Sequence, residues 1–387
     1  MRPTRLALTV ALLGALALSS PAAAQRIELA GRVTASRTVL SQRRVGEPRY
    51  VALSDLFYRD RSALLEVLDL TTQRVVQVQA RRALFERRFG AARGGGVSVP
   101  QGEIAVFGGG IVGLALTETT AGPARRAWYA ELDAVTGKLV RTAGLATLGA
   151  GEQLEIIGAD PTGDAAWFAI TLVDGRRRAL ALRRLDLATL EVRDAQRIEL
   201  PLRTTAGHEH AVTVHAAADF SRFAIVEYAE DGVRMAPGHV YIVDPAAGTS
   251  LAVPAPPTTY GVAFAPDGRY VYLGSAQQGT ISRVNLAAGR IDKQVAAPRY
   301  LHHLVVSPSG TRLFALASSN RYAVYDLPDL TARADATHAP GVAPAMAQLS
   351  GHGVASLDGA YFVVPEPDDR RQVAARERAY VIARLVD

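Results

Sequence analysis

Short apolar stretches alternate with polar turns along almost the whole chain, in runs too short for helices. Residues 262–285, VAFAPDGRYVYLGSAQQGTISRVN, show the unit most clearly: a short apolar strand, a Pro-x-Gly turn, an alternating strand, a polar turn and a third strand. Residues 304–326, LVVSPSGTRLFALASSNRYAVYD, repeat this order. A fourth strand is expected after each, over residues 290–295 and after Leu330. Four short strands per unit predict the blade of a β-propeller.

An acidic or amide residue ends the third strand of each unit. These markers are Asp69, Asp133, Asp186, Asp244, Asn285, Asp326 and Asp387. Their spacing of 41 to 64 residues fits one blade with loop insertions, because a blade usually needs about 40 to 50 residues. Seven markers therefore predict seven blades.

The turn after the first strand of each unit has its own signature. Proline sets φ at the first central position, and glycine takes the position with positive φ. Besides the turns at 266–268 and 308–310, we expect it at Pro100-Gln101-Gly102, 161–163 and 357–359, with a degenerate copy at 219–221.

The last marker is also the last residue, so the final blade lacks a fourth strand of its own. Residues 26–33 have the pattern of such a strand, and we expect them to pair with residues 380–385. The alternative is a frayed N-terminal strand. Pairing would close the ring and protect the sheet edges. The predicted fold is an all-β, seven-bladed β-propeller closed by an N-terminal strand in the last blade.

The segment FAPDGRYVYLGSAQQGTISRVNL, residues 264–286, resembles the YVTN-type repeat of bacterial seven-bladed propellers. That superfamily is similar to lactonase-like propellers and to amine-dehydrogenase heavy chains. The resemblance is close over residues 260–333 and faint elsewhere. The resemblance implies the propeller fold. It says little about function, because the motif is structural.

The first 24 residues have the order of a secretory signal peptide. Arg2 and Arg5 precede an apolar run over residues 6–18, and small residues follow up to Ala24. The run is shorter than the roughly 20 residues that span a bilayer, so we expect cleavage before Gln25. The predicted organisation is a signal peptide over residues 1–24 and a single propeller domain over residues 25–387. A periplasmic or secreted monomer without a membrane span is expected.

The amino-acid composition excludes some kinds of site and partner. The chain has no cysteine, which excludes disulfides, thiolate catalysis and cysteine-ligated metals. Its formal net charge is +6, and the basic pairs are scattered over turns and strands. A nucleic-acid surface would cluster them among aromatic residues, so no nucleic-acid partner is expected. The basic triplet at residues 176–178 is interpreted as solvated.

No catalytic motif is recognised, so the sequence leaves open whether the protein is an enzyme. Residues 108–113, GGGIVG, match the spacing of a dinucleotide loop, but the residues that follow favour a strand rather than the helix that such a site needs. We expect a strand and a turn there. A G-x-S-x-G nucleophile elbow is absent from the sequence.

Polar and aromatic residues precede or begin the predicted inner strands. Because inner strands all start at one end of the central channel, these residues are expected to converge at one mouth. They are the candidate ligand-binding residues: Glu155, His208, His210, Tyr260, Arg299, His302, His303 and His352. Tyr300 has a similar position, whereas His215 is expected to be buried.

Three interpretations of this histidine-bearing mouth stay open. His208, His210, His303 and His352 could hold a transition metal, since neutral imidazole suits such ions. Adjacent His302 and His303 should point to opposite faces of their strand, which argues against both binding one ion. The other interpretations are a polar small-molecule pocket and ordinary channel lining.

The leading functional expectation is an exported ligand-binding or protein-interaction module. Its partner would be a small molecule or a protein. The alternatives are a propeller enzyme, either a lactonase-like hydrolase or a metal-dependent oxidoreductase, and a docking subunit of an envelope complex.

Overall fold

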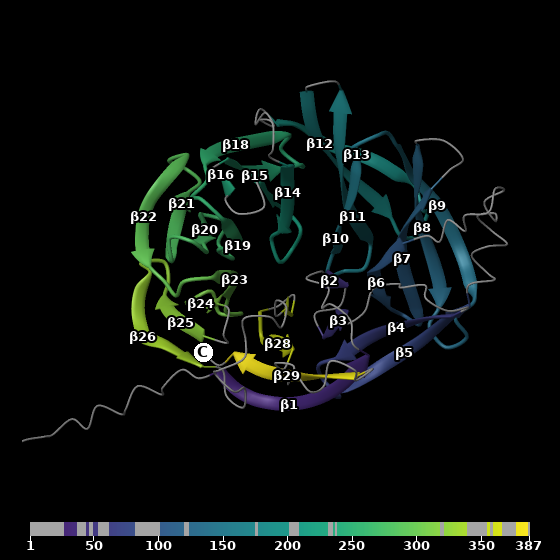
Figure 1. The fold of residues 1–387 in the computed structure, drawn as a ribbon, viewed down its shortest axis with the longest axis horizontal. Coiled ribbons are helices and arrows are strands. Elements are labelled where there is room, and N and C mark those ends of the chain that lie inside the picture. Colours follow the sequence, from purple (N-terminus) through teal and green to yellow (C-terminus); the bar gives the residue numbers. More distant parts are fainter. Residues whose placement is uncertain are drawn as a thin grey trace, which may run out of the picture.

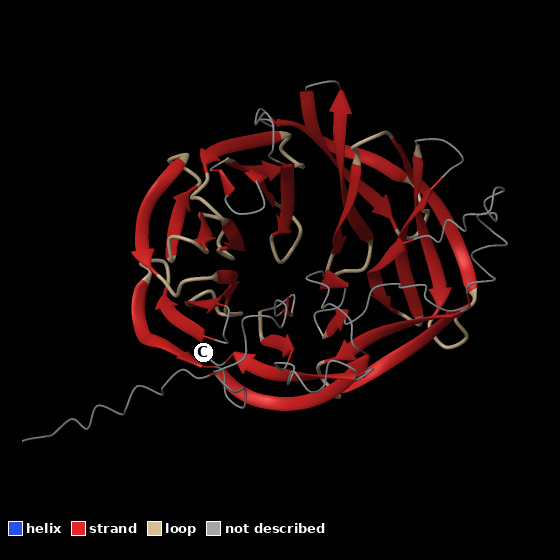
Figure 2. Ribbon diagram, viewed as in Figure 1, coloured by secondary structure: helices blue, strands red, loops and turns tan. Residues whose placement is uncertain are grey.

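The computed structural model describes residues 27–36, 44–45, 49–52, 62–81, 101–119, 124–174, 177–200, 209–230, 235–236, 238–317, 321–338, 354–356, 359–365 and 377–385. All regular secondary structure in these ranges is β-strand, and the strands form seven blades around a central axis (Figures 1 and 2). The predicted seven-bladed propeller is confirmed.

The first three blades each contain four strands in chain order. Blade 1 comprises β2 (Arg44–Val45), β3 (Tyr50–Ala52), β4 (Ser62–Asp69) and β5 (Arg74–Arg81). Blade 2 comprises β6 (Gln101–Gly108), β7 (Ile111–Thr119), β8 (Arg125–Asp133) and β9 (Leu139–Leu148). Blade 3 comprises β10 (Gln153–Ala159), β11 (Ala165–Asp174), β12 (Arg177–Asp186) and β13 (Val192–Leu200).

The next three blades continue the pattern. Blade 4 comprises β14 (Glu209–Ala216), β15 (Phe223–Glu230), β17 (His239–Asp244) and β18 (Thr249–Pro254), with β16 (Met235–Ala236) beside β15. Blade 5 comprises β19 (Thr259–Phe264), β20 (Tyr270–Ser275), β21 (Thr280–Asn285) and β22 (Arg290–Ala296). Blade 6 comprises β23 (Leu301–Val306), β24 (Arg312–Ala317), β25 (Arg321–Asp326) and β26 (Thr331–His338).

Blade 7 combines both ends of the chain. It contains β27 (Val354–Ala355), β28 (Tyr361–Pro365) and β29 (Glu377–Leu385), and its outer strand is β1 (Ile27–Ser36). The pairing of β1 with β29 is antiparallel and runs from Ile27 opposite Leu385 to Ser36 opposite Glu377, with an irregularity at Ala30. This confirms the predicted closure by the N-terminal strand, which lies beside β29 at the rim (Figure 1).

The acidic and amide markers fold a common five-residue turn between the third and fourth strands. Oδ1 of Asp133, for example, accepts hydrogen bonds from the backbone N–H groups of Val135 and Thr136, and Gly137 closes the turn with φ +64°. The fifth position has positive φ in the first six blades, because the chain must reverse with left-handed backbone there. The residues at that position are Gln73, Gly137, Leu190, Gly248, Gly289 and Leu330. The seventh marker, Asp387, lies outside the described residues.

One predicted inner turn is wrong. Gln101 and Gly102 belong to strand β6, where they pair with Thr117 and Leu116. The real turn of blade 2 is formed by Gly109 and Gly110, with φ +57° and +79°. Two consecutive positive φ values are those of a tight hairpin turn, which continuous pairing of β6 with β7 requires. The turn also confirms that residues 108–113 form a strand and a turn.

The core lies between the blades rather than inside any one of them. A side chain on a blade face packs against the facing blade, as Trp167 of blade 3 does against Phe223 of blade 4, with ring centroids 4.8 Å apart. Arginine side chains also form hydrogen bonds between blades. Arg283 of β21 donates to the Pro328 carbonyl of blade 6 at 2.8 Å. Arg141 of β9 donates to the Leu187 carbonyl of blade 3 at 2.8 Å.

One strand pairing goes beyond the predicted pattern. The short inner strand β2 pairs in parallel with β10, at Gly158 opposite Arg44 and Ala159 opposite Val45. Blades 1 and 3 therefore share one eight-stranded sheet, which is continuous beside β6, the inner strand of blade 2 (Figure 1).

Candidate functional site

All inner strands run in the same direction along the axis, so their first residues share one end of the propeller, which we call the mouth. Glu155 lies in β10, Tyr260 in β19, and His302 and His303 in β23, each near the strand's start. Arg299 lies in the loop that leads into β23. The strand direction thus puts these five predicted residues at the same end of the propeller, and their convergence on one binding site stays a prediction.

The remaining predicted histidines are not tested. His208 and His352 lie outside the described residues. His210 is part of β14, where its backbone pairs with Ala229, and its side chain lies outside the described part. Among the described side chains, no group of three His, Cys, Asp or Glu could hold a metal ion. The four-histidine metal site therefore stays a prediction.

Four inner strands carry a β-bulge. The register shifts at residues 260 in β19 and 302 in β23, each the second residue of its strand, and further along the strand at residues 105 in β6 and 157 in β10. A bulge leaves one residue without a direct cross-strand partner and re-aims its side chain. Tyr260 and His302 are the bulged residues of blades 5 and 6, and their rings lie 5.6 Å apart.

His302 and His303 contact different blades. The ring of His302 lies beside Tyr260 of blade 5, whereas the ring of His303 meets Phe362 of blade 7 edge-on at 5.9 Å. Successive side chains of a strand leave on opposite faces, as expected for this pair. His303 thus belongs to the packing between blades 6 and 7. His215, expected to be buried, is half-buried, with Nε2 3.4 Å from the Thr213 hydroxyl.

The loop into β23 presents an exposed aromatic side chain. Tyr300 has φ +60° and is 62% exposed, and its backbone N–H donates to the Ala276 carbonyl at 2.9 Å. A left-handed backbone is strained at a tyrosine and is found in turns and at functional sites. The neighbouring Arg299 is also exposed. An aromatic ring and a guanidinium at the mouth are typical of protein-recognition surfaces.

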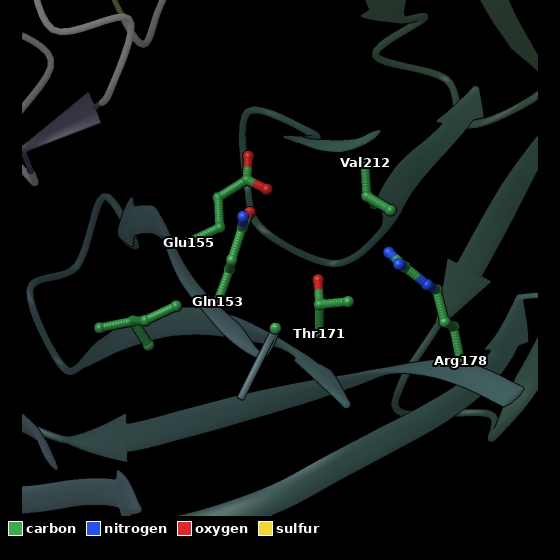
Figure 3. Close-up of a pocket in the computed structure, with 7 residues that line it drawn as sticks. Gln153, Glu155, Thr171, Arg178 and Val212 are labelled. Atoms are coloured by element: carbon green, nitrogen blue, oxygen red, sulfur yellow. The ribbon is translucent and has the colours of Figure 1, made fainter. Parts of the chain in front are cut away.

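A small pocket lies between blades 3 and 4 on the mouth side. Its volume is about 240 Å³, and Figure 3 shows Glu155 and Arg178 on its two sides with Thr171 between them. The lining residues are Gly151, Gln153, Leu154, Glu155, Thr171, Arg178 and Val212. Of these, only Glu155 was a predicted site residue.

The pocket exists because the face of blade 3 toward blade 4 is apolar at one end and polar at the other. Toward the far end, Trp167, Ala169 and Leu180 pack against blade 4 in an apolar cluster. Toward the mouth, polar Thr171 and Arg178 follow them on the same face, since each lies two residues beyond an apolar neighbour. Polar side chains do not close the gap between blades as the apolar ones do, so a cavity opens.

Backbone contacts hold the pocket in place. Glu155 Oε1 accepts a hydrogen bond from the Val214 N–H of β14 at 3.1 Å, which joins blade 3 to blade 4. The loop before β10 is fixed by Glu152, whose Oε2 accepts from Gly149 N–H at 2.7 Å and whose Oε1 accepts from Val173 N–H at 3.3 Å. Glu155 thus supports the wall that it lines.

Alternation along the strand could have identified Arg178. It lies two and four residues before the buried Leu180 and Leu182 on β12, so period two places it on the inter-blade face. The triplet at 176–178 looked solvated because three consecutive arginines hide that alternation. Gln153, Thr171 and Val212 had no comparable signal, because only the pairing of distant strands brings them together.

The opposite end of the axis has a larger cavity of about 660 Å³. It is lined by the turns that follow the inner strands of blades 4 to 7, including Asp219, Pro266, Pro308 and Gly359. None of the predicted site residues whose side chains the structure describes lines it.

Comparisons with known proteins give the fold and no family. No family model matches the chain, and no curated protein matches it. A solved structure described as a crystal structure of a mitotic checkpoint complex contains a similar chain, with a TM-score of 0.51, 13% identity and full coverage of both chains. At this identity the similarity shows the shared fold alone. The described part of the chain contains no helix that could span a bilayer.

Proposed function

We propose that the protein is exported and acts in the periplasm or outside the cell as a binding module, recognising a protein partner at the mouth. The propeller fold is commonly used for protein interaction, and its rigid blades suit it to present loops. We further propose that it is related to the YVTN-type propellers, from the repeat over residues 264–286.

One observation carries the binding proposal: Tyr260 and His302, the bulged residues of neighbouring inner strands, lie with their rings against each other. Bulges are frequent next to functional sites, where they re-aim side chains. Two residues away, Tyr300 adds an exposed ring on a strained backbone. Tyrosine, histidine and arginine together can contact a partner by stacking, hydrogen bonding and charge.

Site-specific photo-crosslinking in cells that export the protein tests this function. A photo-reactive amino acid in place of Tyr300 should give a discrete protein adduct, and Tyr260→Ala in the same chain should weaken it. The matched control is Val135, which is 90% exposed and lies in a turn at the opposite end. Adducts of equal yield from both positions, or none from position 300, would refute recognition at the mouth.

Export is tested separately by the N-terminus of the released protein. Material from outside the cytoplasm should begin at Gln25, after removal of the first 24 residues. A chain that still begins at Met1 would exclude the signal-peptide interpretation.

A further inference from the structure

The pocket between blades 3 and 4 carries opposite charges on its two sides. Glu155 projects from β10 and Arg178 from β12, and both line the pocket (Figure 3). They form no ion pair with each other, and no described residue forms an ion pair or hydrogen bond with the Arg178 guanidinium. The pocket therefore contains a carboxylate, which accepts the Val214 N–H, and a guanidinium that does not pair with it.

Strand register explains why the two charges stay apart. Glu155 is opposite Ala169 on β11, whereas Arg178 is opposite Val173, so they are two strands and four residues apart. With strands about 4.8 Å apart and about 3.3 Å per residue, the two Cα atoms are separated by roughly 16 Å. Even extended side chains leave a gap of several ångströms between the charges.

Neutral hydrogen-bonding groups line the pocket between the two charges. Thr171 lies on the central strand and is paired with Gln153 on one side and Leu180 on the other. Gln153 and Glu155 lie two residues apart on β10, and in Figure 3 the Thr171 side chain stands between Gln153 and Arg178. Val212 of blade 4 forms an apolar wall.

From this arrangement we propose that the pocket binds a small zwitterion whose ammonium and carboxylate groups are further apart than in an α-amino acid. The carboxylate is bound by Arg178, since guanidinium binds carboxylates with two parallel hydrogen bonds. The ammonium is bound by Glu155, and Gln153 and Thr171 contact the polar atoms between. Short peptides and ω-amino acids have this chemistry.

The size of the pocket sets an upper limit on the ligand. Sites for drug-sized molecules measure about 300–1,000 Å³, and this pocket has about 240 Å³. A dipeptide or tripeptide with small side chains, or a five-carbon ω-amino acid, is within that limit.

Calorimetric titration of the full mature chain at neutral pH and low salt tests the charge spacing. We expect diglycine, triglycine or 5-aminopentanoate to bind, and glycine to bind at least about tenfold more weakly, because it cannot reach both charges. Tighter binding of the peptides than of 5-aminopentanoate would identify peptides as the ligand source, and the reverse would identify ω-amino acids.

Capped ligands test each charge separately. N-acetyl-diglycine lacks the ammonium and diglycine amide lacks the carboxylate, so each should lose at least about tenfold in affinity. Affinities of the capped forms equal to that of diglycine would overturn the proposal, as would no binding by any of the three longer zwitterions at millimolar concentration.

Variants assign the charges to residues. Arg178→Gln should abolish the preference for a free carboxylate, and Glu155→Gln should abolish the preference for a free ammonium while keeping an acceptor for Val214 N–H. Arg177→Gln is the matched control, because Arg177 is exposed and adjacent on the opposite face of β12. Equal effects of Arg177→Gln and Arg178→Gln would refute the assignment. If a variant fails to fold, the capped-ligand titrations on the unaltered chain still test the proposal.

This site does not depend on the proposed protein recognition. Loss of zwitterion binding in Arg178→Gln with an unchanged crosslink from position 300 would separate the two activities. A missing crosslink with intact zwitterion binding would refute the protein partner alone.

Discussion

Tyr260 and His302 are the bulged residues of consecutive inner strands, and their rings lie 5.6 Å apart across the gap between blades 5 and 6. The two residues hold equivalent positions, each being the second residue of its inner strand. Their contact joins neighbouring blades at the mouth.

This ring contact should be measurable as a coupling energy. In a double-mutant cycle of Tyr260→Ala and His302→Ala, urea unfolding should give a coupling of about 0.5–1 kcal/mol, as expected for a pair of aromatic rings. Each single variant should keep the fold, since both residues are only partly buried. Strictly additive effects would contradict a direct interaction.

Because β1 closes the ring, its buried side chain Val33 should contribute strongly to the stability of the fold. Val33 is 8% exposed and packs in the cluster between blades 7 and 1, whereas Leu29 is 46% exposed. Val33→Ala should cost about 2 kcal/mol of unfolding free energy, and Leu29→Ala less than about 0.5 kcal/mol. Removing residues 27–36 altogether should lower the melting temperature far more than either substitution. An unchanged melting temperature after that deletion would be incompatible with closure.

The hairpin turn of blade 2 should tolerate only residues that accept positive φ. Gly110 has φ +79°, and a Cβ there would meet nothing within 4 Å, so backbone strain alone opposes a side chain. Gly110→Ala should cost about 1–2 kcal/mol of unfolding free energy. Gly110→Asn is the control and should cost less, since asparagine accepts this conformation readily. Equal losses in thermal unfolding would argue against backbone strain as the cause.

The ion pair between Arg283 and Asp292 should make stability depend on acid pH. Arg283 donates two hydrogen bonds to the Asp292 carboxylate, at 2.8 and 3.1 Å, and these hold the pKa of Asp292 below its usual range. A lowered folded-state pKa stabilises the fold above the unfolded value of about 3.9, and this stabilisation is lost as pH falls through the folded value.

Arg283→Met should therefore lose about 1–2 kcal/mol of unfolding free energy at pH 7. The difference between variant and parent should shrink in urea titrations near pH 3. A difference that stays constant with pH would show that the loss comes from packing or from the Pro328 contact instead.

Tyr325 should limit stability at alkaline pH. Its side chain is buried, its hydroxyl donates to the Ala296 carbonyl at 2.7 Å, and burial raises its pKa to about 12. Because the folded state holds the proton more tightly, the contribution is complete below the unfolded pKa of about 10 and is lost as pH rises toward 12.

Tyr325→Phe should lower stability by about 1 kcal/mol at neutral pH, because the Ala296 carbonyl loses its donor. It should also show a smaller decline than the parent protein between pH 10 and 12, measured by urea unfolding. An identical alkaline decline in both proteins would assign that decline to other tyrosines.

The sequence by itself determined the number of blades and the strand that closes the ring. Both follow from local physics: period-two alternation marks the strands, and turns need Asp or Asn at one end and left-handed backbone at the other. Asp133 and Asn285 mark equivalent turns although their blades differ in length. Where the local signal misled, as at Gln101 and Gly102, strand pairing decided the outcome.

Only the tertiary structure decided which side chains meet. Arg178 and Val212 line one pocket because blades 3 and 4 stack face to face, and no local pattern records which residues of two blades face each other. The same holds for Gly274, where a Cβ would lie 1.8 Å from Leu301 Cδ2 of the next blade. Turn geometry depends on a few neighbouring residues, whereas contacts between blades depend on register, bulges and sheet twist accumulated around the whole ring.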